Sequence, residues 1–176
     1  QLFGAEGLFW TLPVALRNMR LLRVVAGAAP DRVLPLLKRH LEGLTPEQRL
    51  IIEGDARRDL VWTLEELLFR RTTCADATRL LALLAEAENE NWGNNATGVF
   101  SELFHPFHSQ FPLPLQERLQ ILLECADSAR SPGCQLLALK GARQALGRMF
   151  SHMLRRSEAF RPLDKRPAMT YGEVFD

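Results

Sequence analysis

Apolar residues recur along this chain at intervals of three and four positions, the spacing that places side chains on one face of an α-helix. Glycine, proline and small polar residues separate the apolar segments, as they do at helix ends. No segment shows the alternation of apolar and polar residues that is typical of a strand. The pattern therefore predicts an all-α fold. The helices are expected at residues 8–25, 30–41, 46–53, 55–68, 77–90, 96–104, 115–126 and 136–149.

Local signals refine the expected helix ends. Pro13 lies near the start of the first helix or kinks it. Thr45-Pro-Glu-Gln48 has the form of a capping box with proline at the first helical position, and predicts a short helix that stops near Gly54. Thr72-Thr-Cys-Ala-Asp76 is interpreted as the turn before a helix that runs through about Glu90. The buried face of the last helix is expected to consist of Leu136, Leu139, Ala142, Leu146 and Met149.

The stretch at residues 86–100 is the least generic part of the chain, and it joins two helical patterns. Gly93 is expected to end the first helix in the left-handed conformation, because glycine has no Cβ to clash. Asn94 or Asn95 can then cap the next helix by accepting a hydrogen bond from a free backbone N–H group. Trp92 is expected to pack over this corner. These three residues are interpreted as structural, and a binding site formed by them is the alternative.

Acidic side chains crowd the start of the same stretch. Glu86, Glu88 and Glu90 alternate along the expected helix, so they cannot all share one face. We therefore expect a solvated surface rather than two carboxylates that act as acid and base. The chain also lacks both glycine-rich motifs that cradle nucleotide phosphates. Neither catalysis nor a cofactor is expected.

One spacing is compatible with a metal site. Glu102, His105 and His108 can hold a divalent ion if they lie on one helical face. Pro106 interrupts the helix between the two histidines, and no further ligand is near in the sequence. The histidines are therefore expected in a loop or at a helix end, and no metal is expected.

The composition is that of an ordinary globular protein. The chain has 176 residues, of which 47% are apolar and 24% charged, enough for one domain with a core. No apolar run approaches the roughly 18 residues of a membrane span, so no membrane partner is expected. The three cysteines, Cys74, Cys125 and Cys134, are widely spaced and predict neither a disulfide framework nor a zinc site. A reducing cytoplasm fits this usage best.

Two leucine-rich segments resemble each other at an offset of 55 to 56 residues. Leu67-Leu68 and the later Leu80–Leu83 correspond to Leu122-Leu123 and Leu136–Leu139. Such self-similarity favours a helical solenoid of the HEAT or armadillo kind, and an irregular helical bundle is the alternative.

The expected organisation is a single helical-repeat domain over residues 1–160, followed by an irregular segment over residues 161–176 that contains two prolines. The chain begins with Gln1 rather than methionine. We therefore interpret it as a fragment of a longer protein.

Charge is distributed unevenly, although the formal net charge is only +1. Residues 140–166 contain eight basic and two acidic residues, with Arg155 and Arg156 at the centre of this basic zone. Nucleic-acid binding by this surface is one hypothesis, but it normally requires a strongly basic domain with its charges on one face. The pI of 8.0 favours packing or docking of a protein partner instead.

Three segments carry a resemblance to a known family: Asp59–Leu68, Ala75–Leu81 and Leu84–Gly98. Over residues 59 to 104 the chain resembles the helical-repeat region that follows the nucleotide-binding module in some large bacterial STAND-type NTPases. Proteins of that class include antiphage-defence sensors. The resemblance implies a sensor or scaffold region, with the ATPase and effector chemistry outside these residues, and it transfers no functional residue.

Two functions therefore remain open. The first is a non-catalytic scaffold or sensor region that binds a protein, a ligand or other domains of the same polypeptide, within a multidomain NTPase of antiphage-defence type. The second is a nucleic-acid-binding helical module that uses residues 140–166. Candidate interaction residues are Trp92, Asn94, Asn95, Arg155 and Arg156.

Overall fold

The computed structural model describes residues 7, 9, 11–106 and 111–146, and every regular element in this part of the chain is a helix. The prediction of an all-α fold is thereby confirmed for these residues. None of the described helices combines the length and the apolar character that crossing a membrane requires. The helices are α1 (Leu12–Arg17), α2 (Met19–Ala28), α3 (Pro30–Leu41), α4 (Pro46–Leu50), α5 (Gly54–Leu68), α6 (Arg71–Glu86), α7 (Ala96–Glu102), α8 (Leu115–Ala126) and α9 (Pro132–Leu146).

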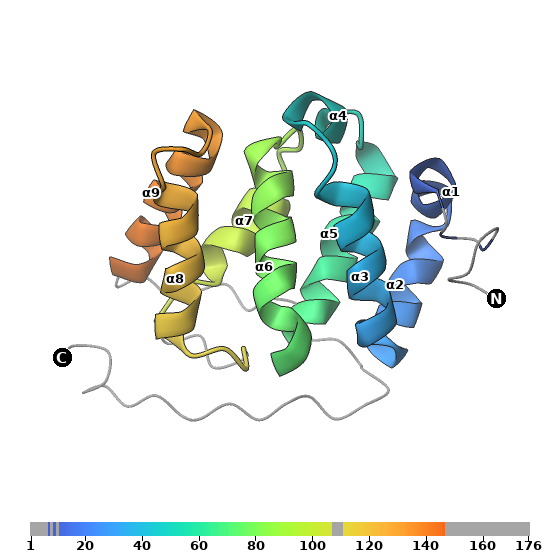
Figure 1. Ribbon diagram of the computed structural model, residues 1–176, viewed down its shortest axis with the longest axis horizontal. Coiled ribbons are helices and arrows are strands. Elements are labelled where there is room, and N and C mark those ends of the chain that lie inside the picture. The colour runs from blue at the N-terminus through green and yellow to red at the C-terminus, as the bar shows by residue number, and fades with distance from the viewer. Residues whose placement is uncertain (1–6, 8, 10, 107–110, 147–176) are drawn as a thin grey trace.

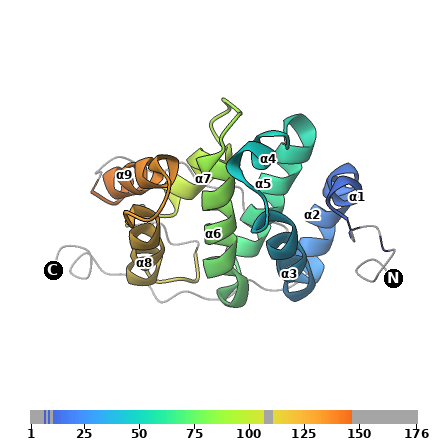
Figure 2. The same ribbon diagram turned by 45° about the horizontal axis from the view of Figure 1, so that its top comes forward.

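The helices lie in two layers (Figure 1 and Figure 2). One layer contains α3, α6 and α8, and the other contains α2, α5, α7 and α9. The long helix α6 is central, because it contacts α3, α5, α7, α8 and α9. Its apolar stripe is buried throughout, with Leu80, Leu81 and Leu84 at most 1% exposed. Because α6 is central, residues at its end can contact several other helices.

Several predicted boundaries differ in the structure. The first expected helix is interrupted at Asn18, whose Nδ2 donates a hydrogen bond of 2.8 Å to the Val14 carbonyl. The interpretation of residues 72–76 as a turn is wrong, since α6 already begins at Arg71. Thr73 is tolerated at this helical position because its hydroxyl bonds to a nearby carbonyl. Thr73 Oγ1 donates to the Leu67 carbonyl at 2.5 Å.

The predicted capping box at the start of α4 is confirmed. Thr45 Oγ1 accepts a hydrogen bond from Gln48 N at 3.3 Å, and Gln48 Oε1 accepts one from Thr45 N at 2.9 Å. The helix ends at Leu50, before the expected stop. Gly54 instead begins α5 with a φ of 59°, a conformation that favours glycine.

The predicted buried face of α9 is wrong for its three leucines, whereas Ala142 is partly buried against the core. Leu136, Leu139 and Leu146 are exposed, and Met149 lies outside the described residues. The side that faces the core has small residues, because α9 approaches α7 and α8 closely. A Cβ added at Gly141 would lie 2.4 Å from Leu122 Cδ1 and 2.9 Å from Phe104 Cδ2. The buried residues of α9 are Cys134, Leu137, Ala138 and Gly141.

Candidate functional site

The segment between α6 and α7, residues 87–95, is called the corner segment here. The expectation that α6 runs through Glu90 is wrong, since the helix ends at Glu86. Gly93 is not in the left-handed region either, so the predicted glycine stop is wrong as well. The helix ends earlier because a side chain from another helix, that of Arg57, binds its last carbonyl groups.

Arg57 is fully buried in α5 and donates hydrogen bonds to the ends of two helices. Its Nη2 donates to the carbonyls of Leu84 at 2.6 Å and Ala87 at 2.7 Å, at the end of α6. Its Nη1 donates to the carbonyls of Arg49 at 3.2 Å and Ile52 at 3.3 Å, at the end of α4. The last carbonyls of a helix lack intrahelical partners, and this guanidinium supplies them.

The charge of Arg57 is balanced by Glu88 in the corner segment, whose Oε1 lies 3.4 Å from Nη2. Burial lowers the pKa of the Arg57 guanidinium, and the Glu88 carboxylate opposes that effect. A buried ion of this kind is tolerated only when it is paired and hydrogen-bonded. Arg57 meets both conditions.

The three glutamates of this region bind other elements rather than forming a solvated surface. Glu86 Oε2 lies 2.7 Å from Arg49 Nη2, and Glu86 Oε1 accepts from the Ser131 hydroxyl before α9. Glu90 Oε1 accepts from Gly54 N, at the start of α5, at 2.7 Å. The side chains of Glu86 and Glu88 are only 12% and 17% exposed, so the sequence-based expectation is wrong for these two. It assumed a helix, whereas the non-helical backbone beyond Glu86 lets alternate residues reach inward.

Asn95 caps α7, as one of the two predicted possibilities. Its Oδ1 accepts from Gly98 N at 2.9 Å, and its Nδ2 donates to the Glu90 carbonyl at 2.7 Å. Asn94 is exposed and is not the cap. Glu88 Oε2 is a second acceptor at this helix start and carries a negative charge, 2.9 Å from Thr97 N.

Close packing within the corner segment depends on Gly98. A Cβ at this position would lie 2.2 Å from the Gly93 carbonyl oxygen, a backbone atom. The glycine that cannot be replaced without a clash is therefore Gly98, on α7, rather than Gly93. Trp92 is partly buried, and its indole nitrogen is buried without a hydrogen-bond partner.

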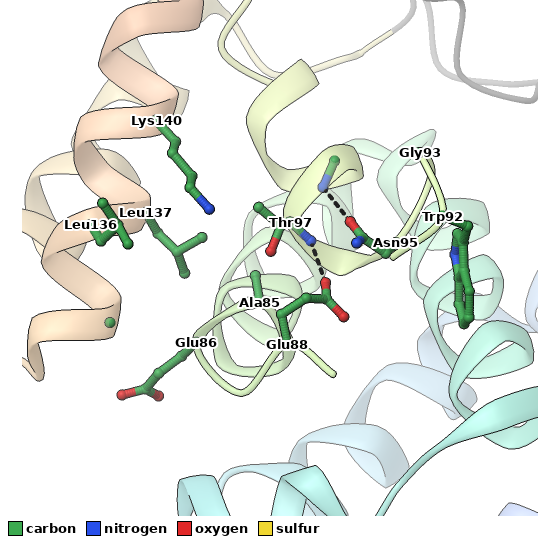
Figure 3. Close-up of a pocket in the computed structure, with 12 residues that line it drawn as sticks. Ala85, Glu86, Glu88, Trp92, Gly93, Asn95, Thr97, Leu136, Leu137 and Lys140 are labelled. Atoms are coloured by element: carbon green, nitrogen blue, oxygen red, sulfur yellow. Dashed lines mark hydrogen bonds between the residues drawn. The ribbon is translucent and has the colours of Figure 1, made fainter. Parts of the chain in front are cut away.

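A pocket of about 490 Å³ separates this region from α9 (Figure 3). Leu137 and Lys140 reach from α9 toward Thr97, and Trp92 lies on the opposite side (Figure 3). The carboxylates of Glu86 and Glu88 are already bound to arginines, whereas Lys140 is exposed. The pocket can therefore accept an apolar group with an acidic neighbour. Its lining residues are Ala85, Glu86, Glu88, Trp92, Gly93, Asn95, Thr97, Gly98, Gly133, Leu136, Leu137 and Lys140.

The other candidates from the sequence are not brought to this pocket. Arg155 and Arg156 lie outside the described residues, as does His108. His105 is buried, and Glu102 Oε1 accepts from Gln144 Nε2 at 3.2 Å. In the part of the chain that the structure describes, no three histidine, cysteine or acidic residues gather as they would around a metal ion.

Sequence reasoning missed one proximity. Cys125 near the end of α8 and Cys134 in the first turn of α9 line the same pocket. The sequence does not predict this proximity, because the two cysteines meet across a tight turn that no sequence motif marks.

Comparisons of the chain with protein-family models, with curated proteins and with solved structures give no match.

Proposed function

We propose that this chain is a non-catalytic helical scaffold that binds another protein, or another domain of the same polypeptide, through its α8–α9 end. The observation that supports this most is the exposure of leucines there. Leu136, Leu139 and Leu146 follow one another at spacings of three and seven positions, on one side of α9, and are 53%, 68% and 86% exposed. Leu123 on α8 is 61% exposed. Exposed aliphatic side chains that share a helix face are typical of an interaction surface.

The internal similarity of the chain strengthens this proposal. Leu123 and Leu136 correspond to Leu68 and Leu80, which are 0% and 1% exposed within the α5–α6 pair. The same pattern is thus buried where further helices cover it and exposed where the described helices end. A partner with an apolar helical face would cover the α8–α9 leucines as the neighbouring helices cover the α5–α6 leucines.

Charge narrows the chemistry of the partner. Lys140 and Arg143 are exposed on α9, beside the leucines. Basic residues at the rim of an apolar surface favour acidic residues at the rim of the partner, which steer association and fix orientation. The pocket next to Lys140 would receive one apolar side chain of that partner.

The arrangement also supports a HEAT- or armadillo-like repeat as the finer description of the fold. Its support is the two-layer packing, in which α5–α6 and α8–α9 are successive helix pairs, together with their leucine similarity. The resemblance of residues 59–104 to the helical-repeat region of STAND-type NTPases fits the same proposal. In that context the chain would be a sensor or scaffold region, possessing no ATPase chemistry of its own.

Site-specific photo-cross-linking in the native host tests the proposal. A photoreactive amino acid replaces Leu139 in one variant and Ile51 in a control variant, since Ile51 is 78% exposed at a distant place between α4 and α5. We expect a discrete heterologous adduct from position 139 that is absent from position 51. The added substitution Leu136→Glu should abolish it, because a charge would have to be buried at the interface.

Three outcomes would contradict this proposal. Equal adducts from both positions would mean that the α8–α9 end is not selective, and an adduct only with a second copy would make the surface a homodimer interface. ATP turnover by the purified chain, removed by a point substitution within it, would contradict a non-catalytic role.

A further inference from the structure

Two of the three cysteines face each other across the turn that joins α8 to α9. Cys125 lies one residue before the end of α8, Cys134 is the third residue of α9, and both side chains line one pocket. Both are buried, at 5% and 7% exposure. Cys74 lies apart from them on α6, at 0% exposure.

The local structure stabilises a thiolate at Cys134. Its backbone N–H donates to Ser131 Oγ at 3.1 Å, which fixes the first turn of α9, and the N-terminus of a helix favours negative charge. The interaction with Cys125 lowers the pKa of the Cys134 thiol, against the effect of burial. Arg130 and Arg49 also lower it, and Glu86 raises it.

Cys125 has the complementary character. The interaction with Cys134, together with burial, raises the pKa of the Cys125 thiol, so Cys125 keeps its proton. Arg130 acts in the opposite direction, and Glu124 adds to the increase. One nucleophilic thiolate beside one protonated thiol is the combination that a reactive cysteine pair uses.

A small reagent can reach the pair. Cys125 and Cys134 line a partly open pocket of about 260 Å³ between α6 and the α8–α9 turn. Arg79, Glu124 and Arg130 form part of the same wall. This pocket is separate from the corner-segment pocket, which lies on the other side of the start of α9.

We propose that Cys134 and Cys125 form a redox-reactive dithiol that hydroperoxides oxidise to an intramolecular disulfide. The Cys134 thiolate attacks one peroxide oxygen, the O–O bond breaks, and Cys134 becomes a sulfenic acid. With hydrogen peroxide the leaving group is hydroxide, which takes up a proton to become water. Cys125 sulfur then attacks the sulfenic sulfur, the S–O bond breaks, and the proton of Cys125 leaves with that oxygen as the second water. The two thiols together lose two electrons, which reduce the peroxide.

The test uses the full chain, reduced, purified and treated with hydrogen peroxide at neutral pH. Unreacted thiols are then alkylated, and digestion with mass spectrometry identifies the products. We expect a mass loss of about 2 Da, from the two hydrogens removed, and a linkage between Cys125 and Cys134. Cys74 should remain reduced, because burial raises the pKa of its thiol to about 12. Oxidation should accelerate as the pH rises and level off once Cys134 is ionised, since the thiolate is the reacting form.

Single variants separate the two roles. In Cys125→Ser the reaction should stop at a sulfenic acid on Cys134, which dimedone traps. In Cys134→Ser the oxidation of Cys125 should be at least about tenfold slower than in the native chain, because the nucleophile is missing. Cys74→Ser is the matched control and should leave disulfide formation unchanged.

Three results would overturn the proposal: equal oxidation of Cys74, fast oxidation of Cys125 in Cys134→Ser, or no linkage in native protein under conditions that oxidise free cysteine. The native-protein measurement needs no variant, so a variant that fails to fold leaves the test intact.

Discussion

At the scale of single residues, Asn95 makes two side-chain hydrogen bonds that its neighbour Asn94 does not make. Its side chain caps α7 through Oδ1 and binds the corner segment through Nδ2. Asn94 is exposed one position earlier. The same substitution at these two adjacent asparagines therefore provides a matched comparison, because only the position of the changed residue differs.

Asn95→Ala should reduce the free energy of unfolding by roughly 1–2 kcal/mol, because the cap of α7 is lost. Asn94→Ala should change it by less than about 0.5 kcal/mol, as expected for an exposed residue without such a role. Urea denaturation followed by circular dichroism measures both. Equal losses in the two variants would show that the cap is not the source of the stability.

The sequence predicted that one of these asparagines caps α7, but it could not select between them. The choice depends on Gly98, which must approach Gly93, and on Glu88, which binds Thr97 N. These contacts fix where the first turn of α7 begins. They arise from the path of the corner segment, and local sequence rules do not describe that path.

At the scale of helices, small residues determine how closely α9 packs. The leucine spacing of α9 indicated a buried face, and the structure places that face outward. A stripe of small side chains allows a closer approach than leucines would, and the surrounding atoms then gain dispersion contacts. Periodicity identified the helix correctly but not its rotation about its own axis, since both faces contain apolar residues.

Gly141→Ala tests this packing. The added methyl group would overlap Leu122 and Phe104, so we expect a loss of roughly 1–3 kcal/mol in the free energy of unfolding, as for other overpacked cores. Gly27 in α2 is the matched control, because a Cβ there meets no atom within 4 Å.

Gly27→Ala should instead stabilise the protein by roughly 0.5–1 kcal/mol, since alanine loses less conformational entropy in a helix. Thermal denaturation of the two variants side by side distinguishes a packing effect from a helix-propensity effect. A gain in stability from Gly141→Ala would show that α9 does not pack as closely as described.

At the scale of the whole molecule, a polar network rather than apolar packing alone joins the helix ends. Arg57, Arg49 and the three glutamates bring together the ends of α4 and α6 and the starts of α5, α7 and α9. The sequence predicted the all-α fold and most helix lengths. It could not predict this network, because its members are 27 or more positions apart in the main contacts, for example Arg57 to Leu84 and Arg49 to Glu86.

Arg57→Met should destabilise the whole protein by roughly 3–5 kcal/mol, the range seen when one partner of a buried ion pair is removed. Methionine keeps most of the apolar volume but donates no hydrogen bond, so the carbonyls of two helix ends lose their partner. Arg58→Met is the control, since Arg58 is 42% exposed and its ion pair with Asp55 lies at the surface. Its effect should be below about 1 kcal/mol.

Chemical denaturation should record a single transition for Arg57→Met, shifted to lower denaturant. A loss as small as that of Arg58→Met would mean that the helix ends do not depend on this guanidinium.

The leucines at the α8–α9 end also bear on how such a chain can change in evolution. Because that end already presents the pattern that an inner helix pair buries, a duplicated pair could be added there without altering the residues beneath it. The corner segment offers no such freedom, since an insertion would separate glutamates that bind three different helices and the residue before α9. We therefore expect length variation among descendants of this gene at the leucine end, and a constant number of residues between α6 and α7.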